Sequence, residues 1–177
     1  MPVRTANAIW KGKVKKGNGT LSVESGFLKN ANYSFSSRFE NSKGTNPEEL
    51  IGAAHAGCFS MALSLMLEEK GYNPESIETE AKVYIEMEKN NIFISKIELN
   101  TKAKVPNIDK NAFTDITTAA KNNCPVSKAL AGVNIELSAE LILIIFFIFL
   151  YINYLELKLR ESILVQKRFF SNYYGYY

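Results

Sequence analysis

The chain has 177 residues, of which 46% are hydrophobic, and a formal net charge of +3. This length and apolar content suffice for one globular core without a second domain. Residues 1–140 hold 17 basic and 16 acidic side chains, so they lack the clustered positive charge of a nucleic-acid-binding surface. With two cysteines and no cluster of His and Cys, we expect no nucleic-acid partner and no zinc site.

The N-terminal segment has no apolar stretch of the kind that opens a secretory signal. We therefore expect the body of the protein to be soluble and cytoplasmic. Three strands are predicted next, because polar and apolar side chains alternate in residues 8–14, 20–24 and 33–39, with turn residues between them. The third of these strands would carry Arg38 near its middle.

A long helix is predicted after these strands. Thr45 or Asn46 can act as its N-cap, Pro47 suits the first helical position, and the two glutamates that follow favour the positive end of the helix dipole. Gly71 should end the helix at about residue 70. Its many small residues, flanked by bulky ones, predict a fully buried helix at the centre of the fold.

The remainder of the body predicts a hairpin, two helices and a strand. Residues 77–87 and 92–101 alternate as strands, Asp109 should cap a helix to about residue 122, and Cys124 with the proline after it should open a short helix that ends at Gly132. A final strand spans 133–140. The order of elements indicates an α+β fold, with buried helices on an antiparallel β-sheet.

The tail differs in composition from everything before it. Residues 141–177 contain no Ala, Asp, Thr, Pro, Met or Cys, yet they hold 11 of the 21 aromatic residues. The apolar run 141–152 is shorter than the roughly 17–25 residues of a spanning helix. We therefore predict a domain at 1–140 and, at 141–177, an extension that resembles AT-rich sequence read past a stop or out of frame. A short membrane anchor is the alternative.

The two cysteines are the candidates for chemistry. Cys58 lies in the small, apolar segment of the long helix, and Cys124 lies at the predicted start of a short one. In a cytoplasmic chain this pattern indicates redox chemistry rather than a structural disulfide. The alternative is two buried free thiols without a role.

A reactive thiol must ionise, and burial in an apolar helix would raise the pKa of Cys58. A nearby cation would have to counteract this, and Arg38 is the one arginine between Arg4 and the tail. Glu48 or Glu49 could orient it through a bidentate pair. The alternative is a solvated arginine and two glutamates that serve only the helix dipole.

The spacing of these residues sets a constraint. Ten residues separate Glu48 from Cys58, which is about 15 Å along a straight helix. The two cannot share a site on one helix unless its first turns deviate or the glutamate acts in a neighbouring subunit. A site built across a twofold interface would allow Glu48 of one subunit to share a site with Cys58 of the other.

The segment 44–64, which contains Asn-Pro-Glu48 and Ala-His-Ala-Gly-Cys58-Phe-Ser, closely resembles the signature of the OsmC family of osmotically inducible peroxidases. The Asn-Cys124-Pro-Val-Ser segment and the Trp10-Lys-Gly segment resemble it too, so the likeness covers about residues 6–140. It implies an OsmC-like α+β fold in which an antiparallel sheet wraps around central helices of an intertwined homodimer. The tail has no counterpart in this pattern.

The resemblance also implies an activity. The family reduces organic hydroperoxides, and hydrogen peroxide less well, without a metal or other cofactor. Its peroxidatic cysteine corresponds to Cys58 and its resolving cysteine to Cys124, its activating arginine to Arg38 and its glutamate to Glu48. Cys58 would become a sulfenic acid, Cys124 would condense with it to a disulfide, and a dithiol reductant would reset the pair.

Two further features of the sequence allow more than one interpretation. His55, the only histidine, precedes Cys58 by three residues, and a structural histidine with a local hydrogen bond is favoured over a Cys–His ion pair. For the whole chain, the alternative function is a non-enzymatic module that binds a lipid or another small molecule, with membrane contact only if the tail is a genuine anchor.

Overall fold

The computed structural model describes residues 2–89, 91–142 and 154–164. Contacts divide the chain into two units, Met1–Leu141 and Ile142–Tyr177. In the second unit, residues 154–164 form a helix that is exposed along its length. Most of the apolar run 141–152, the candidate membrane anchor, lies outside the described residues.

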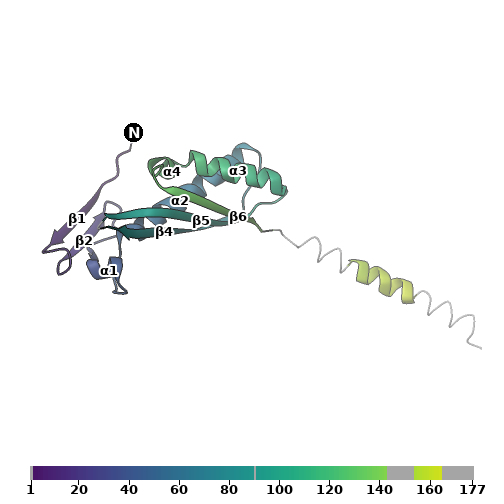
Figure 1. The fold of residues 1–177 in the computed structure, drawn as a ribbon. Coiled ribbons are helices and arrows are strands. Elements are labelled where there is room, and N and C mark those ends of the chain that lie inside the picture. The colour runs from purple at the N-terminus through teal and green to yellow at the C-terminus, as the bar shows by residue number, and fades with distance from the viewer. Residues whose placement is uncertain (1, 90, 143–153, 165–177) are drawn as a thin grey trace, which may run out of the picture. The chain divides into compact units, whose positions relative to one another are not determined.

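The described residues of the first unit form six strands and four helices (Figure 1). In chain order they are β1 (Ala6–Lys11), β2 (Asn18–Val23), β3 (Ala31–Ser34), α1 (Phe35–Phe39), α2 (Pro47–Glu69), β4 (Ser76–Glu88), β5 (Asn91–Lys104), α3 (Lys110–Asn123), α4 (Pro125–Ala129) and β6 (Asn134–Leu141).

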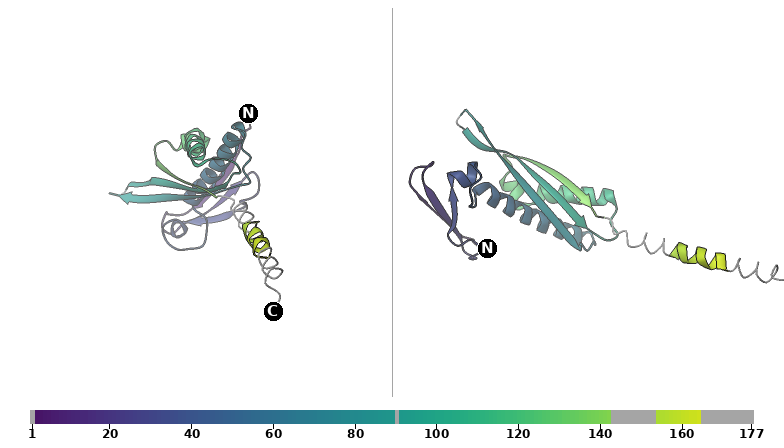
Figure 2. Two further views of the ribbon diagram at one scale, coloured as in Figure 1. Left: turned by 90° about the vertical axis from the view of Figure 1, so that its right-hand side faces the viewer. Right: turned by 90° about the horizontal axis from the view of Figure 1, so that it is seen from below.

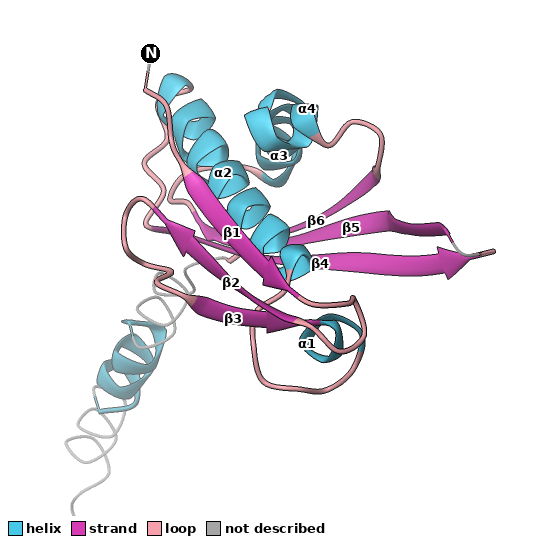
Figure 3. Ribbon diagram, turned by 90° about the vertical axis from the view of Figure 1, so that its left-hand side faces the viewer, coloured by secondary structure: helices cyan, strands magenta, loops and turns pink. Residues whose placement is uncertain are grey.

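The first sheet is antiparallel, in the order β1-β2-β3 (Figure 3). Trp10 on β1 and Tyr33 on β3 both pair with Gly19 of the middle strand, and their rings lie 5.3 Å apart. A Cβ at Gly19 would lie 2.4 Å from the Tyr33 ring, so glycine is needed for this close approach. Nearly all of β1 is exposed, including Ile9 at 55%.

The prediction of a strand through residue 39 is wrong, because β3 ends at Ser34 and α1 begins there. The Ser34 side chain accepts a hydrogen bond from the Ser37 N–H at 3.0 Å, and the Ser37 hydroxyl accepts one from the Ser34 N–H at 2.9 Å. This reciprocal capping box starts a helical turn despite the alternating pattern. Arg38 therefore lies in the last turn of α1 and not in the middle of a strand.

The start and end of α2 follow the prediction. Asn46 is the N-cap, and its side-chain oxygen accepts a hydrogen bond from the Glu49 N–H at 2.8 Å. Pro47 occupies the first helical position, where no intrahelical N–H is required. At the other end Gly71 takes a φ of +83°, which suits a glycine just beyond a helix.

The prediction that α2 is fully buried is wrong for a single chain. Phe59, Leu63 and Leu67 on one face are completely buried in the core. The opposite face is open, with Met61 76% and Leu65 57% exposed. By length and composition alone α2 could also cross a membrane, a test that the core helices of soluble proteins pass as well.

The second sheet has the order β4-β5-β6, and α2 lies along it (Figure 2). The long hairpin β4–β5 is antiparallel, as predicted, but β6 pairs with β5 in parallel. The prediction of a wholly antiparallel sheet is therefore wrong. A parallel neighbour needs a crossover connection, and α3 with α4 supplies it. Cys124 lies in this crossover.

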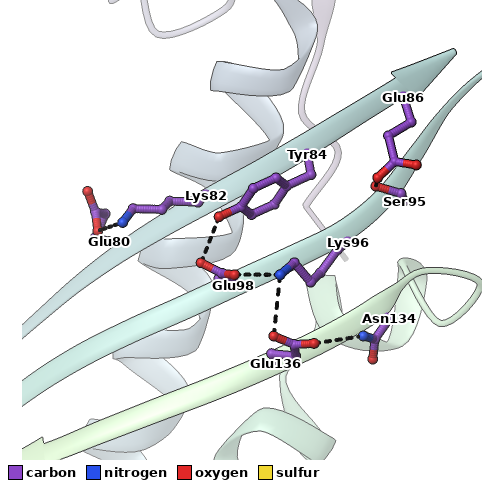
Figure 4. A network of polar contacts seen from close by, with 9 residues as sticks. All are labelled: Glu80, Lys82, Tyr84, Glu86, Ser95, Lys96, Glu98, Asn134 and Glu136. Atoms are coloured by element: carbon purple, nitrogen blue, oxygen red, sulfur yellow. Dashed lines mark hydrogen bonds and ion pairs between the residues drawn. The ribbon is translucent and has the colours of Figure 1, made fainter.

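The two faces of this sheet differ in polarity. One face packs against α2 and α3. The other carries a network of polar contacts (Figure 4), in which Lys96 donates to Glu98 at 2.6 Å and the Tyr84 hydroxyl donates to the same carboxylate at 2.9 Å. This outer network contains no thiol among its members. The chemistry must therefore be sought on the helical side.

Candidate functional site

The two cysteine sulfurs are neighbours. Cys58 lies in the middle of α2, whereas Cys124 is both the C-cap of α3 and the N-cap of α4. Both are free thiols, and their Sγ atoms lie 3.1 Å apart although 66 residues separate them. Cys124 is completely buried, and Cys58 is partly exposed. The packing of α3 and α4 on α2 thus brings together the two residues that the sequence pattern selected.

The two thiols have opposite pKa shifts. Burial is the main influence on Cys58 and raises its pKa, against a smaller opposing effect of the Val126 N–H. Burial is also the largest single influence on Cys124 and would raise its pKa. Hydrogen bonding with Ser127, Cys58 and Val126 together outweighs it, so the pKa of Cys124 is lowered. The direction for Cys58 agrees with the sequence-based expectation for a thiol buried in an apolar helix.

Arg38 and Glu48 form a close ion pair. Arg38 Nη2 lies 2.6 Å from Glu48 Oε1, and Arg38 Nε donates to both carboxylate oxygens at 3.1 Å. Glu48 is 8% exposed, whereas Glu49 lies at the surface. The sequence did not decide between Glu48 and Glu49 as the partner of Arg38. In the structure the partner is Glu48. A carboxylate held this way fixes the orientation of the guanidinium plane.

An aromatic hollow of about 270 Å³ lies beside this ion pair. Its walls come from the first sheet, α1 and the start of α2, and the lining residues are Trp10, Val14, Tyr33, Ser34, Phe35, Arg38, Phe39 and Pro47. The Arg38 guanidinium also lies 5.0 Å from the centre of the Phe39 ring. The hollow therefore combines apolar walls with one cation.

Within one chain, the ion pair and the thiols are separate. Glu48 and Cys58 both belong to α2, which runs from Pro47 to Glu69 as a single helix. Their backbones are about 15 Å apart along its axis. The first turns of α2 do not deviate to shorten this distance. The described structure of one chain therefore does not bring the ion pair to the thiols.

His55 has a partner that the sequence did not predict. Its Nε2 lies 2.8 Å from the Ser127 Oγ, and both side chains are buried. The expected local hydrogen bond is thus a contact across 72 residues, and an ion pair with Cys58 is not present. The His55 Nδ1 is buried without a hydrogen-bond partner, and burial lowers the pKa of this histidine. One feature of the sequence points to the contact between His55 and Ser127. His55 precedes Cys58 by three residues, and Ser127 follows Cys124 by three.

No metal centre is evident in the part of the chain that the structure describes. Nowhere in residues 2–89, 91–142 and 154–164 do three or more His, Cys, Asp or Glu side chains gather as a metal-binding group.

Comparison with known proteins places this site in a family. Residues 40–138 match the model of the OsmC-like protein family, and this region contains both cysteines and Glu48. The chain belongs to the OsmC family. It is 52% identical over 127 residues to Peroxiredoxin OsmC of Escherichia coli, an alignment that covers 72% of this chain and 89% of the relative.

Members of the organic hydroperoxide resistance branch are more distant. The chain is 31% identical over 102 residues to OhrB of Bacillus subtilis, covering 58% of this chain and 73% of that protein. The crystal structure of OhrB shares the fold, with a TM-score of 0.56 and coverage of 78% of this chain and 98% of OhrB. A second structure, an organic hydroperoxide resistance protein from Elizabethkingia anophelis, gives a TM-score of 0.60, with coverage of 80% and 99%. The α+β fold class is thereby confirmed, and family membership together with the thiol pair makes the chain a cysteine peroxidase.

Proposed function

We propose that the protein reduces organic hydroperoxides to alcohols, and hydrogen peroxide less efficiently, by means of Cys58 and Cys124. The observation that carries the proposal is the 3.1 Å contact between the two sulfurs, with one thiol partly exposed and the other buried. A hydroperoxide must reach the sulfur that attacks it. This requirement assigns the attack to Cys58.

The proposed reaction balances with one hydroperoxide for each chain. The Cys58 thiolate attacks the distal oxygen, the O–O bond breaks, and the alkoxide takes up a proton and leaves as the alcohol. Cys124 then attacks the Cys58 sulfenic acid, which forms a disulfide and releases water. A dithiol reductant returns the pair to the thiol state. Such reductants maintain thiols in the cytoplasm, which is where we place the protein.

We further propose that the working unit is a homodimer. Ala54, Gly57, Met61 and Leu65 form an exposed strip along α2, spaced by three or four residues so that they share one face. An open apolar face of this kind marks a contact with another protein surface. Nearly all of β1 in the first sheet is exposed, and this strand offers further surface for the contact between subunits.

A dimer would also unite the separated parts of the site. The Arg38–Glu48 pair of one subunit would stabilise the Cys58 thiolate of the other, which would offset the effect of burial on the pKa of Cys58. The aromatic hollow beside Arg38 would then receive the apolar part of the hydroperoxide. Organic hydroperoxides would be preferred because hydrogen peroxide has no group to fill it.

The first test counts thiols. Reduced protein is mixed with substoichiometric cumene hydroperoxide, and loss of peroxide is compared with loss of free thiols. The proposal requires two thiols lost for each peroxide in the wild-type protein and no peroxide loss in Cys58→Ser. Hydroperoxide that is bound but not consumed would instead indicate a small-molecule-binding module.

The second test asks whether Arg38 acts across the dimer. Arg38→Ala and Cys58→Ser chains carry different affinity tags, are coexpressed, and the mixed dimer is isolated through both tags. If the arginine acts on its partner, the mixed dimer holds one complete site and regains about half of the wild-type rate, although each variant alone is nearly inactive. If it acts within its own chain, the mixed dimer holds no complete site and stays inactive.

A further inference from the structure

The turn that connects β1 to β2 is strongly basic. Residues 1–140 are close to neutral as a whole, but residues 1–23 hold five basic side chains and no acidic one. Four of the five lie together in residues 11–17, which we call the basic turn, and all four are exposed: Lys11, Lys13, Lys15 and Lys16. The reaction described above gives these lysines no role.

In the part of the chain that the structure describes, the lysines of the basic turn form no ion pair. The six ion pairs found there all involve other side chains. The first acidic residue of the sequence, Glu24, follows the far end of β2 and accepts a hydrogen bond from the Thr5 N–H at 3.2 Å. The positive charge of the turn is therefore available to an anionic partner.

The basic turn has a defined conformation. The Lys13 carbonyl accepts hydrogen bonds from the N–H groups of Lys16 at 3.0 Å and Gly17 at 2.6 Å. Gly12 takes a φ of +91°, which favours glycine, and its carbonyl accepts a hydrogen bond from the Trp10 indole N–H at 2.9 Å. Trp10 is part of the wall of the aromatic hollow, so the turn is attached to that wall.

One side chain of the basic turn is apolar. Val14 is 66% exposed and stands between Lys13 and Lys15 in the sequence. It also lines the aromatic hollow, together with Trp10 of β1 and Phe39 of α1. The connection between β1 and β2 accordingly lies beside α1 (Figure 3). An exposed apolar residue among lysines thus forms part of the hollow that the proposed function assigns to the hydroperoxide.

This combination of charges and an apolar side chain fits a lipid surface better than a nucleic acid. A nucleic acid is bound through a stripe of basic residues along a face, whereas the excess charge here lies in one turn. At an anionic bilayer, lysines contact the headgroup phosphates while an apolar side chain enters the boundary with the acyl chains. Val14 has a use in the second arrangement and none in the first.

We propose that the basic turn is a docking site for anionic lipid bilayers, in which its four lysines contact lipid phosphates and Val14 enters the interface. Docking would bring the aromatic hollow to the bilayer, where apolar hydroperoxides collect. This use of the docking site rests on the proposed function, whereas the docking itself does not. It also requires no contribution from residues 141–177.

The first experiment measures binding to vesicles in the absence of peroxide. Full-length protein is sedimented with vesicles of phosphatidylcholine alone or of phosphatidylcholine mixed with phosphatidylglycerol. The parent should prefer the mixed vesicles, and high salt should weaken this binding. The triple variant Lys13→Gln, Lys15→Gln, Lys16→Gln should bind them roughly 100-fold more weakly, because each lysine near an anionic bilayer contributes about fivefold.

The matched control removes three exposed lysines elsewhere in the first unit, by Lys29→Gln, Lys70→Gln and Lys110→Gln. It has the same net charge as the turn variant and should bind nearly as well as the parent. Equal losses in the two triple variants would overturn the inference, because total charge would then be responsible. Val14→Ser keeps every charge and should weaken binding roughly fivefold, since it removes the apolar contact. Thermal melts confirm that each variant is folded.

The tail cannot explain a difference between these variants, because all of them contain it. Equal binding of the parent and the turn variant to mixed vesicles would overturn the inference and assign the membrane contact to another part of the chain. Tighter binding to a duplex DNA oligonucleotide than to mixed vesicles, lost in the turn variant, would also overturn it and identify a nucleic-acid site.

The second experiment connects docking to the reaction. Rates are measured with cumene hydroperoxide in solution and with phospholipid hydroperoxide in mixed vesicles. The turn variant should keep the first rate and lose most of the second, and equal rates of the parent and the turn variant on vesicles would overturn the delivery of substrate by docking. A protein that binds vesicles through the turn but consumes neither peroxide would instead refute the proposed function and leave the docking site intact.

Discussion

Arg38 and Glu48 face one another from two consecutive helices, and the arginine Nε is equidistant, at 3.1 Å, from both carboxylate oxygens. The carboxylate is buried while the arginine side chain is 35% exposed, so the guanidinium has one edge held and another free. The exposed edge of the Arg38 guanidinium can therefore interact with an anionic group of another chain.

Arg38→Ala should raise the pKa of Cys58 and slow the reaction with cumene hydroperoxide more than about tenfold, since each pKa unit changes the thiolate fraction tenfold. Glu48→Gln should have a milder effect, because the cation remains but is less well oriented. Alkylation of Cys58 against pH, in a Cys124→Ser background, gives the measurement. Glu49→Gln is the matched control, as this neighbouring glutamate is exposed. An unchanged pH profile in Arg38→Ala would rule out the assignment.

Cys58→Ser should abolish peroxide reduction, whereas Cys124→Ser should permit one turnover and then stall. The reason is the difference in exposure between the two sulfurs, since only the residue at 58 is open to a substrate. Mass spectrometry after a single turnover should find sulfenic or sulfinic acid on Cys58 in the Cys124→Ser protein. A Cys124→Ser protein that is inactive in the first turnover, with Cys58→Ser still active, would reverse the two roles.

Met61→Asp should convert the proposed dimer to a monomer and lower the peroxidase rate, because it places a charge in the exposed strip of α2. Met87→Asp is the control, since Met87 is 62% exposed near the end of β4 and lies outside the strip. Light scattering coupled to size-exclusion chromatography gives the mass of each variant. A Met61→Asp protein that keeps the mass of the parent would show that the strip is not the interface.

Truncation after Leu141 should leave the peroxidase rate and the dimer unchanged and improve solubility. Both cysteines, Arg38 and Glu48 precede this position, and β6 is complete at Leu141. The sequence of 141–152 is a continuous apolar run, and runs of this kind promote aggregation when they are exposed. Loss of activity in a folded truncated protein, or release from a membrane fraction that the full-length protein occupies, would show that the tail has a function.

Acid should destabilise the protein partly through His55. Burial holds its folded-state pKa below the ordinary histidine value of 6.5, so below about pH 6.5 the unfolded chain binds a proton that the folded chain does not. Stability should then fall with decreasing pH by up to about 1.4 kcal/mol per pH unit until the folded-state pKa is reached. Because this is the only histidine, His55→Gln should flatten the denaturation profile just below pH 6.5. If the stability of the wild-type and His55→Gln proteins fell equally with decreasing pH, His55 would not be the source of the loss.

The elements with strong local signals could be predicted from the sequence. The caps at Asn46 and Asp109 and the hairpin around residue 90 depend on near neighbours in the chain, and all three lie where expected. The pairing of Cys58 with Cys124 came from a family resemblance, because no local rule brings together two residues so far apart.

The errors have physical causes as well. At residues 33–39 an alternating pattern competed with a capping box that only the Ser34 and Ser37 side chains could form, and the box prevailed. The parallel pairing of β6 depends on the path of the crossover, which is not encoded in the strand itself. The contact of His55 with Ser127 requires two helices to be docked before it exists.

The burial of Cys124 affects how a disulfide between the two cysteines would be reduced. In a disulfide between the two cysteines, an external thiol could approach the sulfur of residue 58 but not the enclosed sulfur of residue 124. The mixed disulfide would therefore form on α2, and Cys124 would depart as the leaving group. The hydrogen bonds that lower the pKa of Cys124 make it a good one, because thiol–disulfide exchange is faster when the departing thiolate is stable. The N-terminus of α4 would thus serve both directions of the cycle, stabilising the same thiolate when it attacks and when it is expelled.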